Sequence, residues 1–253
     1  MASSTHIVRS YLEELEALDV DLAQMGGLAE SHLSTAIEAI ARRDDAAAER
    51  VIAGDARVDA LDRDVQSRVY RLLALRQPVA IDLRTTISAI RIASELERVA
   101  DLAKNTAKRA LVLNAGPPLK MSTSVLRLGR ICLTRLADVL NAYAERDAGK
   151  AMAVWGGDNQ VDELFNSLFS EILTAMAEDA AAIDACTHLA FVAKNFERIG
   201  DHATNIAEAI HFLVVGEHVA EERPKGDVTS STSIAKSPSP GVDLASEDDA
   251  DPT

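Results

Sequence analysis

Aromatic residues and cysteines are scarce in this sequence. Phe, Trp and Tyr together make up 4% of the 253 residues, and only two cysteines occur. Strands favour aromatic and β-branched residues, so a chain in which Ala, Leu, Ile and Val dominate suits closely packed helices. Cys132 and Cys186 lie inside helical patterns without CxxC spacing, which indicates reduced core residues of a cytoplasmic protein. We therefore predict an all-α fold.

The sequence also lacks long apolar runs and an excess of basic residues. No run approaches the ~20 residues of a membrane span, and the N-terminus lacks the basic-then-apolar layout of a signal peptide. The net charge of -14 and the pI near 4.8 argue against nucleic-acid binding and do not favour an anionic membrane surface. We expect a cytoplasmic protein whose partners are cations or basic protein surfaces.

Apolar residues recur at helical spacing and predict six long helices in two similar halves. The expected helices span residues 7–43, 44–77, 81–113, 122–145, 148–179 and 182–215. Pro78 ends the second helix, and the breaker Asn114-Ala115-Gly116-Pro117-Pro118 separates the halves. We therefore divide the chain into residues 7–114, residues 119–215 and a tail of residues 216–253.

Two glycine pairs and the C-terminal segment depart from regular helix. Gly26-Gly27 predicts a bend or a close helix approach, and Trp155-Gly156-Gly157 predicts a bend or a break in the fifth helix. From Glu217 onward, nine acidic against three basic residues give the tail a charge of -6. Its Ser, Thr, Pro, Gly and Asp content predicts a disordered acidic tail whose simplest role is solvation.

One acidic motif is written twice, at an offset of 100 residues. Glu97-Arg98-Val99-Ala100-Asp101 is repeated as Glu197-Arg198-Ile199-Gly200-Asp201, with Asn105 and Asn205 beyond. Positions i, i+4 and i+8 share nearly one azimuth of an α-helix, so each copy aligns two carboxylates and an amide along ~12 Å of one face. Each acidic strip lies about half a turn from an apolar stripe.

A second acidic pair lies on the preceding helix of each half, Asp55 with Asp59 and Asp158 with Asp162. In antiparallel hairpins the two motifs of each half lie at one level. The residues expected opposite one another are Asp59 and Glu97, Asp55 and Asp101, Asp162 and Glu197, and Asp158 and Asp201. Four carboxylates so close together repel one another and raise one another's pKa unless a cation neutralises them.

These eight carboxylates are candidate metal ligands. Oxygen ligands without cysteine suit Mg, Ca, Mn or iron better than a structural zinc site. Level-matched sets in both halves favour metal binding over the alternative, which is a pair of solvated faces with basic partners such as Lys104, Lys108 and Lys194.

A catalytic role is the weaker interpretation of the same residues. Di-iron carboxylate bundles use two Glu-x-x-His motifs that point into the core. Only Glu208-x-x-His211 has that spacing here, and no phosphate loop or nucleophile motif occurs. We predict that the protein is not an enzyme. A metal-dependent carboxylate-bundle enzyme or a metal store remains the alternative.

Three stretches resemble the PhoU family of phosphate-uptake regulators: Pro78 to Arg84, Glu95 to Asn105, and Asn195 to Glu208. The resemblance covers about residues 7–215. It implies two tandem antiparallel three-helix bundles with metal held by Glu/Asp-x-x-x-Asp pairs. The residues that match the family's metal motifs are Glu97, Asp101, Glu197 and Asp201, with Asp55, Asp59, Asp158 and Asp162 on the preceding helices. Iron is the metal most expected, with Mg, Mn, Zn or Ni as alternatives.

The resemblance also implies a function. The family acts as a negative regulator of phosphate uptake and phosphate-starvation signalling, linking the ATPase subunit of a phosphate ABC transporter to a sensor histidine kinase. A homodimer is plausible for bundles of this kind. The sequence departs from the family pattern in its second half, which lacks a full Pro-Val-Ala-x-Asp-Leu-Arg stretch, and in its acidic tail.

Overall fold

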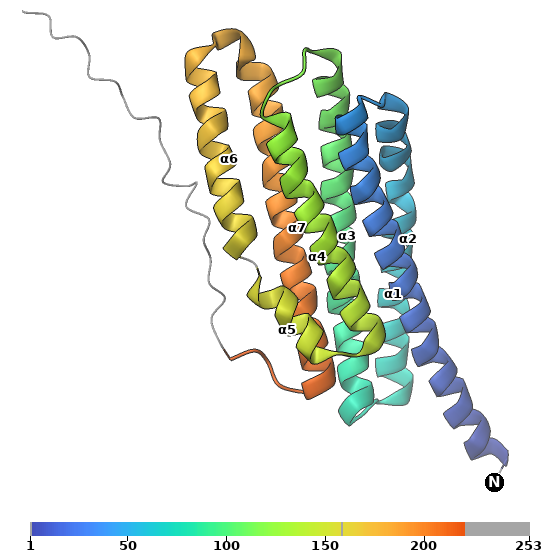
Figure 1. Cartoon of the computed structure of the whole chain (residues 1–253). Coiled ribbons are helices and arrows are strands. Elements are labelled where there is room, and N and C mark those ends of the chain that lie inside the picture. The colour runs from blue at the N-terminus through green and yellow to red at the C-terminus, as the bar shows by residue number, and fades with distance from the viewer. Residues whose placement is uncertain (1, 158, 221–253) are drawn as a thin grey trace, which may run out of the picture.

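The chain folds into long helices joined by short connections (Figure 1). The computed structural model describes residues 2–157 and 159–220, and this part contains no strand. The helices are α1 (Ala2–Arg42), α2 (Asp45–Arg76), α3 (Ala80–Ala115), α4 (Ser122–Glu145), α5 (Ala148–Gly156), α6 (Asn159–Glu178), the 3-10 helix η1 (Ala180–Ala182) and α7 (Ile183–Val215). The predicted all-α fold is confirmed. Most of the predicted tail lies outside the described residues.

The first two helices of each half are joined in the same way. Arg43 and Arg146 adopt left-handed backbone angles, with φ of 55° and 53°. Asp44 and Asp147 follow them, and each carboxylate accepts a hydrogen bond from the backbone N–H three residues further on, at 2.9 and 3.0 Å. Such a cap satisfies one of the free N–H groups at a helix start. The second helix of each half therefore begins with the same aspartate N-cap.

The expected fifth helix is broken into two. Helix α5 ends at Gly156 and α6 begins at Asn159, and Figure 1 draws α5 and α6 as separate helices. Glycine has the lowest helix propensity after proline, and two adjacent glycines make continuation of the helix unfavourable. Just before the break, the indole Nε1 of Trp155 donates a hydrogen bond of 3.1 Å to Glu208 on α7. The sequence pattern therefore marked a true break.

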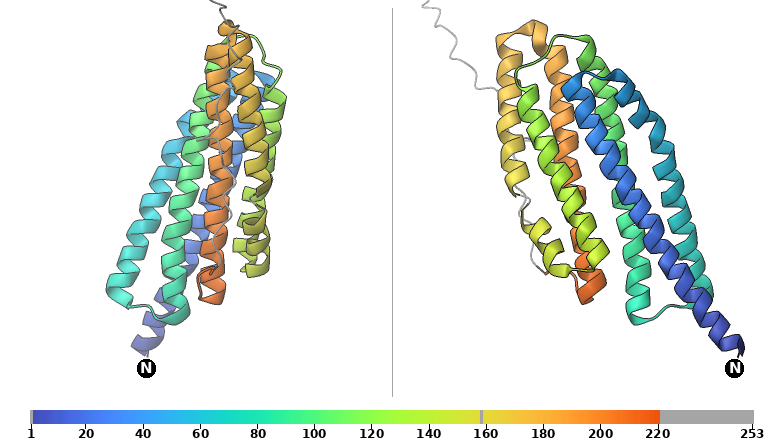
Figure 2. Two further views of the ribbon diagram at one scale, coloured as in Figure 1. Left: turned by 90° about the vertical axis from the view of Figure 1, so that its left-hand side faces the viewer. Right: turned by 45° about the vertical axis from the view of Figure 1, so that its right-hand side comes forward.

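Helices α3 and α7 form the centre of the molecule. Helix α3 packs against α1, α2 and α7, whereas α7 packs against α3, α4, α5 and α6. Figures 1 and 2 show α1 and α2 on the α3 side of this pair, and α5 and α6 on the α7 side. Helices α1 and α4 also touch, because Gly26 lets Leu140 approach to 2.6 Å from the place of a Cβ atom. The predicted close approach at Gly26 thus exists.

The central pair is antiparallel and joined by buried polar contacts. The Ser88 hydroxyl donates to the Ala209 carbonyl at 3.3 Å. Further along, the Glu95 carboxylate lies 2.6 Å from His202 Nδ1 and accepts a bond of 3.1 Å from Asn205. Burial alone would raise the pKa of Glu95, but these partners outweigh it and hold that pKa below its ordinary value. The contacts fix the register of the two helices in the apolar core.

Both cysteines are buried and neither forms a disulfide among the described residues, as expected. Within the described residues no helix is both long enough and apolar enough to cross a membrane.

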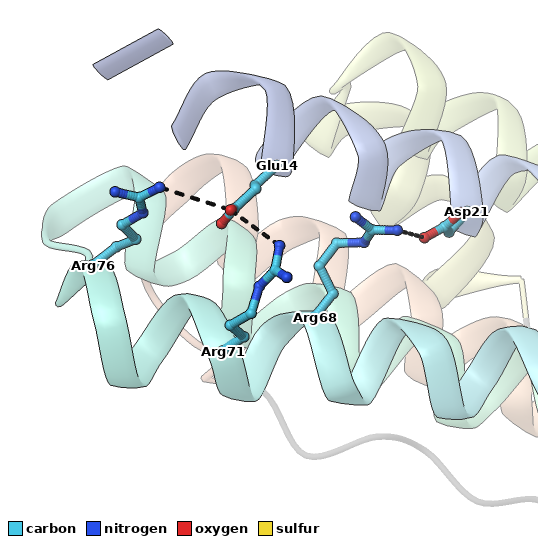
Figure 3. A network of polar contacts seen from close by, with 5 residues as sticks. All are labelled: Glu14, Asp21, Arg68, Arg71 and Arg76. Carbon is cyan, nitrogen blue, oxygen red and sulfur yellow. Dashed lines mark hydrogen bonds and ion pairs between the residues drawn. The ribbon is translucent and has the colours of Figure 1, made fainter. Parts of the chain in front are cut away.

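Ion pairs hold α2 along α1. Figure 3 shows the Glu14 carboxylate between Arg71, at 3.1 Å, and Arg76, at 3.8 Å, with Asp21 and Arg68 3.1 Å apart further along. Pairs that remain partly exposed contribute only ~0–1 kcal/mol each, so their main effect is on register. Here every carboxylate faces an arginine, in contrast to the acidic sets on α2 and α3.

Candidate functional site

The first acidic set lies between α2 and α3. The Lys104 ammonium contacts the Asp55 carboxylate on α2 and lies 2.6 Å from Asp101 Oδ1 on its own helix. Sharing one ammonium places Asp55 and Asp101 at one level across the hairpin. Asp55 is only 5% exposed, so the set reaches deeper between the helices than the sequence pattern indicated.

Further carboxylates of this set lie around Glu97. Burial raises the pKa of Glu97, and the neighbouring carboxylates of Asp101, Asp62, Asp59 and Asp55 raise it further. Burial also raises the pKa of Asp62, which the acidic motifs had not singled out. The first half therefore carries five mutually repelling carboxylates and one lysine that neutralises two of them.

Helix α1 adds a histidine to the first set. His32 is 9% exposed, and its Nδ1 has no hydrogen-bond partner among the described residues. Burial lowers the pKa of His32, while the nearby Asp55 carboxylate opposes that shift. The ring faces α2, because Nε2 lies 2.7 Å from the place where a Cβ atom on Gly54 would stand. A neutral imidazole thus lies against the backbone that carries Asp55.

The second acidic set lies between α6 and α7. Asp162 and Glu197 are 4% and 3% exposed, and Asp201 is partly buried. The Lys194 ammonium lies 2.9 Å from Glu197 Oε2. Asp158, the fourth predicted member, lies outside the described residues. Three of the four predicted carboxylates therefore belong to the α6–α7 hairpin, at the same helix contact as in the first half.

An arginine takes the histidine's place in the second half. Arg135 lies 22 residues before Gly157, as His32 lies 22 residues before Gly54. Its Nη1 lies 2.7 Å from the place of a Cβ atom on Gly157, the same clearance that His32 has at Gly54. Arg135 is 9% exposed. Each half thus uses a glycine directly before its first aspartate to admit a buried basic side chain.

Two hydrogen bonds anchor the guanidinium of Arg135. Its Nη2 donates to the Val154 carbonyl at 2.8 Å and to the Thr204 hydroxyl at 3.2 Å. Thr204 occupies the position in α7 that Lys104 occupies in α3, 100 residues earlier. The second half therefore has a threonine where the first half has Lys104, and it adds a buried guanidinium from its first helix.

Sequence reasoning missed His32, Arg135 and the two glycines because it matched acidic residues only. A usable signal was present. The glycine before each Asp-x-x-Val-Asp motif and the shared 22-residue spacing are both visible in the sequence. This spacing shows that His32 and Arg135 occupy equivalent positions in the two halves, and that the residues at this position differ in charge.

The donor atoms of the first set suit a divalent cation, although they are not gathered around one point. Across the described parts of the chain, no three His, Cys, Asp or Glu side chains are arranged to hold one ion. Buried oxygens of Asp55 and Asp62 and the Nδ1 of His32 nevertheless lack hydrogen-bond partners there. Carboxylate oxygen with imidazole nitrogen is a donor set for borderline divalent metals. Lys104 meanwhile neutralises Asp55 and Asp101.

The Glu208-x-x-His211 pair is engaged elsewhere. Glu208 accepts the Trp155 indole bond described above, and His211 Nδ1 lies 3.0 Å from the Glu217 carbonyl oxygen.

Two copies of one helical domain, each with an acidic set between its last two long helices, make this a duplicated all-α protein. The PhoU domain family matches residues 22–110 and 125–210, one match in each half. The chain belongs to the PhoU family, as the sequence motifs predicted.

Relatives match over nearly their whole length. The phosphate-specific transport system accessory protein PhoU homolog of Caulobacter vibrioides is 51% identical over 226 residues, covering 89% of this chain and 98% of that protein. Its counterpart in Rhizobium meliloti is 44% identical, covering 90% and 97%.

Solved structures agree with the fold. The crystal structure of PhoU from Pseudomonas aeruginosa superposes with a TM-score of 0.80 at 34% identity and covers 82% of this chain and all of that one. The phosphate transport system regulatory protein PhoU from Streptococcus pneumoniae gives 0.76 at 30% identity, covering 83% and 100%.

Proposed function

We propose that this protein is a negative regulator of phosphate uptake and phosphate-starvation signalling that acts in the cytoplasm. The observation that carries this proposal is its 51% identity to a phosphate-specific transport system accessory protein, over 98% of that protein. The regulator associates with the ATPase subunit of a phosphate ABC transporter and with a sensor histidine kinase. Transporter state is thereby conveyed to the kinase when phosphate is plentiful.

Metal binding is part of the proposal. Carboxylates that repel one another and buried donors without hydrogen bonds support it, because a divalent ion would relieve both. Iron is the preferred metal, with Mg, Mn, Zn or Ni as alternatives. The proposed ligands are the predicted residues Asp55, Asp59, Glu97, Asp101, Asp158, Asp162, Glu197 and Asp201. The chemistry that the ion supplies is charge neutralisation, which holds the helices of a hairpin together.

An adaptor needs an exposed surface for its partners, and the α2–α3 turn offers one. Leu75, Val79 and Ile81 are 71%, 73% and 58% exposed around this turn. Val79 and Ile81 belong to the stretch that resembles the family's Pro-Val-Ala-x-Asp-Leu-Arg motif. We assign partner contact to this turn. Val79→Ser with Ile81→Ser is then expected to weaken capture of the ATPase subunit or the kinase while leaving the helical content intact.

The decisive experiment replaces the chromosomal gene and measures a phosphate-starvation reporter in phosphate-rich medium. Deletion is expected to raise the reporter, and the full chain to repress it again. The variant carrying Glu97→Gln, Asp101→Asn, Glu197→Gln and Asp201→Asn is expected to lose bound metal and repression, with circular dichroism as the folding control. A deletion strain with an unchanged reporter would refute the regulatory role.

The same preparations test the remaining points. Metal analysis of untagged protein purified without chelator measures the ion directly, and light scattering tests for the proposed homodimer. Redox turnover or bulk iron loading by the purified chain, without capture of transporter or kinase, would instead favour the enzyme or metal-store alternative.

A further inference from the structure

Helices α6 and α7 lie side by side and form an apolar groove on the surface of the second half (Figure 1). The groove has a volume of about 400 Å³, and the large side chains that line it are Phe165, Phe169, Leu173, Met176 and Phe191. The rings of Phe165 and Phe169 lie 6.0 Å apart, and Phe191 remains 49% exposed. Contiguous apolar surface of this kind marks an interaction site, whereas single exposed apolar residues are ordinary. We call this surface the α6–α7 groove.

The shared fold does not require apolar residues at these positions. The Asp-x-x-Val-Asp motif recurs at an offset of 103 residues, so Phe165 and Phe169 correspond to Asp62 and Gln66 in the first half. There the Gln66 amide donates a hydrogen bond of 2.7 Å to the Asp62 carboxylate. Residues needed only to pack one helix of a hairpin on the other would be apolar in both halves. The α6–α7 groove is therefore particular to the second half.

A guanidinium without a carboxylate partner borders the groove. The Arg109 guanidinium on α3 lies 4.0 Å from the centre of the Phe191 ring, and its Nη1 lies 3.3 Å from His188 Nδ1. Burial lowers the pKa of Arg109, and no carboxylate among the described residues pairs with it. An occupant of the groove that carries a carboxylate would therefore supply the missing counter-charge.

Further cations lie near this guanidinium. The Lys194 ammonium lies 4.9 Å from the centre of the Phe165 ring and also pairs with Glu197. Lys108, on α3, and Arg198, one turn beyond Lys194 on α7, are exposed. The rim of the groove is thus basic, although the chain as a whole has a net charge of -14. Its best occupant combines large apolar side chains with adjacent acidic residues.

The C-terminal tail of this chain has such a sequence. Val242 and Leu244 are two of the four large apolar residues that follow Ala220. Residues 242–251 include five acidic residues and no basic one. This segment lies outside the described residues, so its complementarity to the groove is one of composition and charge.

The tail is long enough to reach the groove. Phe191 lies 24 residues before Val215, the last residue of α7, which is ~36 Å along the helix axis. The 22 residues from Ala220 to Val242 can span up to ~70 Å. The tail can therefore turn back along α7 and still place residues 242–251 at the groove.

We propose that the α6–α7 groove binds the tail of the same chain, with Val242 and Leu244 against its aromatic rings and Glu247-Asp248-Asp249 against Arg109 and the neighbouring cations. A tethered segment binds at a high effective concentration, so individually weak contacts suffice. The tail covers the groove, and a partner protein that binds there has to displace it. This contact needs neither metal nor transporter, so it is independent of the proposed function.

Photo-crosslinking in the full-length chain tests the contact. A photoreactive p-benzoylphenylalanine in place of Leu244 keeps a large apolar group at that position. Irradiation is expected to join it to α6 and α7 residues of the groove within single chains, as seen by denaturing gel and peptide mapping. The same label in place of Ser230 is the control, because residues 229–233 are all Ser or Thr. Its yield in the groove should be at least ~5-fold lower, since no apolar anchor lies nearby.

Variants of the groove separate its apolar and charged contacts. Phe191→Ser is expected to lower the Leu244-label yield at least ~5-fold, because the most exposed ring is lost. Arg109→Gln is expected to lower it about 2-fold and to reduce its sensitivity to added NaCl, because salt screens an exposed charge contact. Tyr70→Ser is the matched control, because Tyr70 is a 59% exposed aromatic residue in the first half. Circular dichroism confirms that each variant is folded.

The possible outcomes distinguish three occupants of the groove. Crosslinks found only in a band of twice the mass would assign the groove to a second copy and overturn the same-chain contact. A Leu244-label yield no higher than that of the Ser230 label, or a yield unchanged by Phe191→Ser, would also overturn the proposal and leave the groove to a partner from outside the chain. The phosphate-starvation reporter tests the proposed function separately.

Discussion

The two halves of this protein solve one electrostatic problem in two ways. Both bury carboxylates between their last two long helices, and both use a glycine to admit a basic side chain from their first helix. The first half places His32 there and neutralises Asp55 and Asp101 with the movable Lys104. The second places the anchored Arg135 there and has Thr204 at the lysine position. The duplicated backbone therefore keeps the same space beside a glycine in both halves, while the side chain that fills it is a histidine in one half and a permanently charged arginine in the other.

Exchanging each basic residue for leucine is expected to give the largest difference between the halves. Arg135→Leu should lower the free energy of unfolding by about 3–5 kcal/mol, because the buried Val154 carbonyl and Thr204 hydroxyl both lose their donor, at about 1–3 kcal/mol each. His32→Leu in metal-free protein should change it by less than about 1.5 kcal/mol, because a ring without resolved hydrogen bonds is replaced by an apolar side chain of similar volume. Urea denaturation in chelator measures both. Equal losses in the two variants would contradict the comparison.

Filling the glycine positions is expected to have a smaller effect, of similar size in both halves. Gly54→Ala and Gly157→Ala each drive a Cβ atom to 2.7 Å from a buried nitrogen, which should cost about 1–3 kcal/mol of unfolding free energy. The helix propensity of alanine offsets up to about 1 kcal/mol of this cost at Gly54.

A double-mutant cycle checks the cause of that loss. Combining Gly54→Ala with His32→Ala should restore part of the stability, with a coupling of at least about 0.5 kcal/mol. Strict additivity of the two changes would show that the contact is not what limits the position.

The helix caps should show where the halves are alike. Asp44→Ala and Asp147→Ala each remove a side-chain bond to a backbone N–H, and each should cost about 1 kcal/mol. Conversion to asparagine, which retains the accepting oxygen, is the matched control. A difference of more than about 1 kcal/mol between the two caps would show that the halves differ in overall stability as well as in charge.

The pH dependence of stability should separate Glu97 from Glu95, two residues apart on α3. The pKa of Glu97 is raised above 4.5, so its protonation contributes stability below 4.5, and that contribution is lost as the pH rises through the raised value. The pKa of Glu95 is lowered, so its contribution is present above 4.5 and is lost as the pH falls through the lowered value.

Substitution of each glutamate by glutamine tests these two opposite effects on stability in metal-free buffer. At pH 7, Glu97→Gln is expected to raise the urea midpoint and Glu95→Gln to lower it. The Glu97→Gln difference should shrink as the pH falls toward 4.5, whereas the Glu95→Gln difference should persist to that pH and shrink below it. A Glu97→Gln midpoint below that of the wild type at pH 7 would show that the first set is already neutralised without metal.

Periodicity predicted the helices well because an apolar stripe determines both where a helix forms and which face it buries. The breaks at Pro78, at residues 114–118 and at Gly156-Gly157 were visible for the same local reason. The α2–α3 level matching of Asp55 and Asp101 followed from hairpin symmetry alone.

The depth of the acidic sets was harder to predict. Azimuth alone placed the carboxylates half a turn from the core, yet Asp55 and Glu197 are almost fully buried, because a neighbouring helix covers that face. Burial of this kind depends on packing between helices and not on the pattern within one. The partners of Arg135 come from α5 and α7, so only the folded chain reveals them.

The bond between Glu95 and His202 has a mechanical consequence. Glu95 lies two residues before Glu97, and His202 follows Asp201, so this contact ties together the two helices that carry the acidic sets. Sliding one helix past the other by a single residue is a shift of about 1.5 Å, enough to break a contact of 2.6 Å. The central helices therefore act as one strut. A partner that binds one half and favours one register of α3 and α7 therefore changes the affinity of the other half for its own partner. Thermodynamic linkage requires the second partner to change the affinity for the first by the same factor.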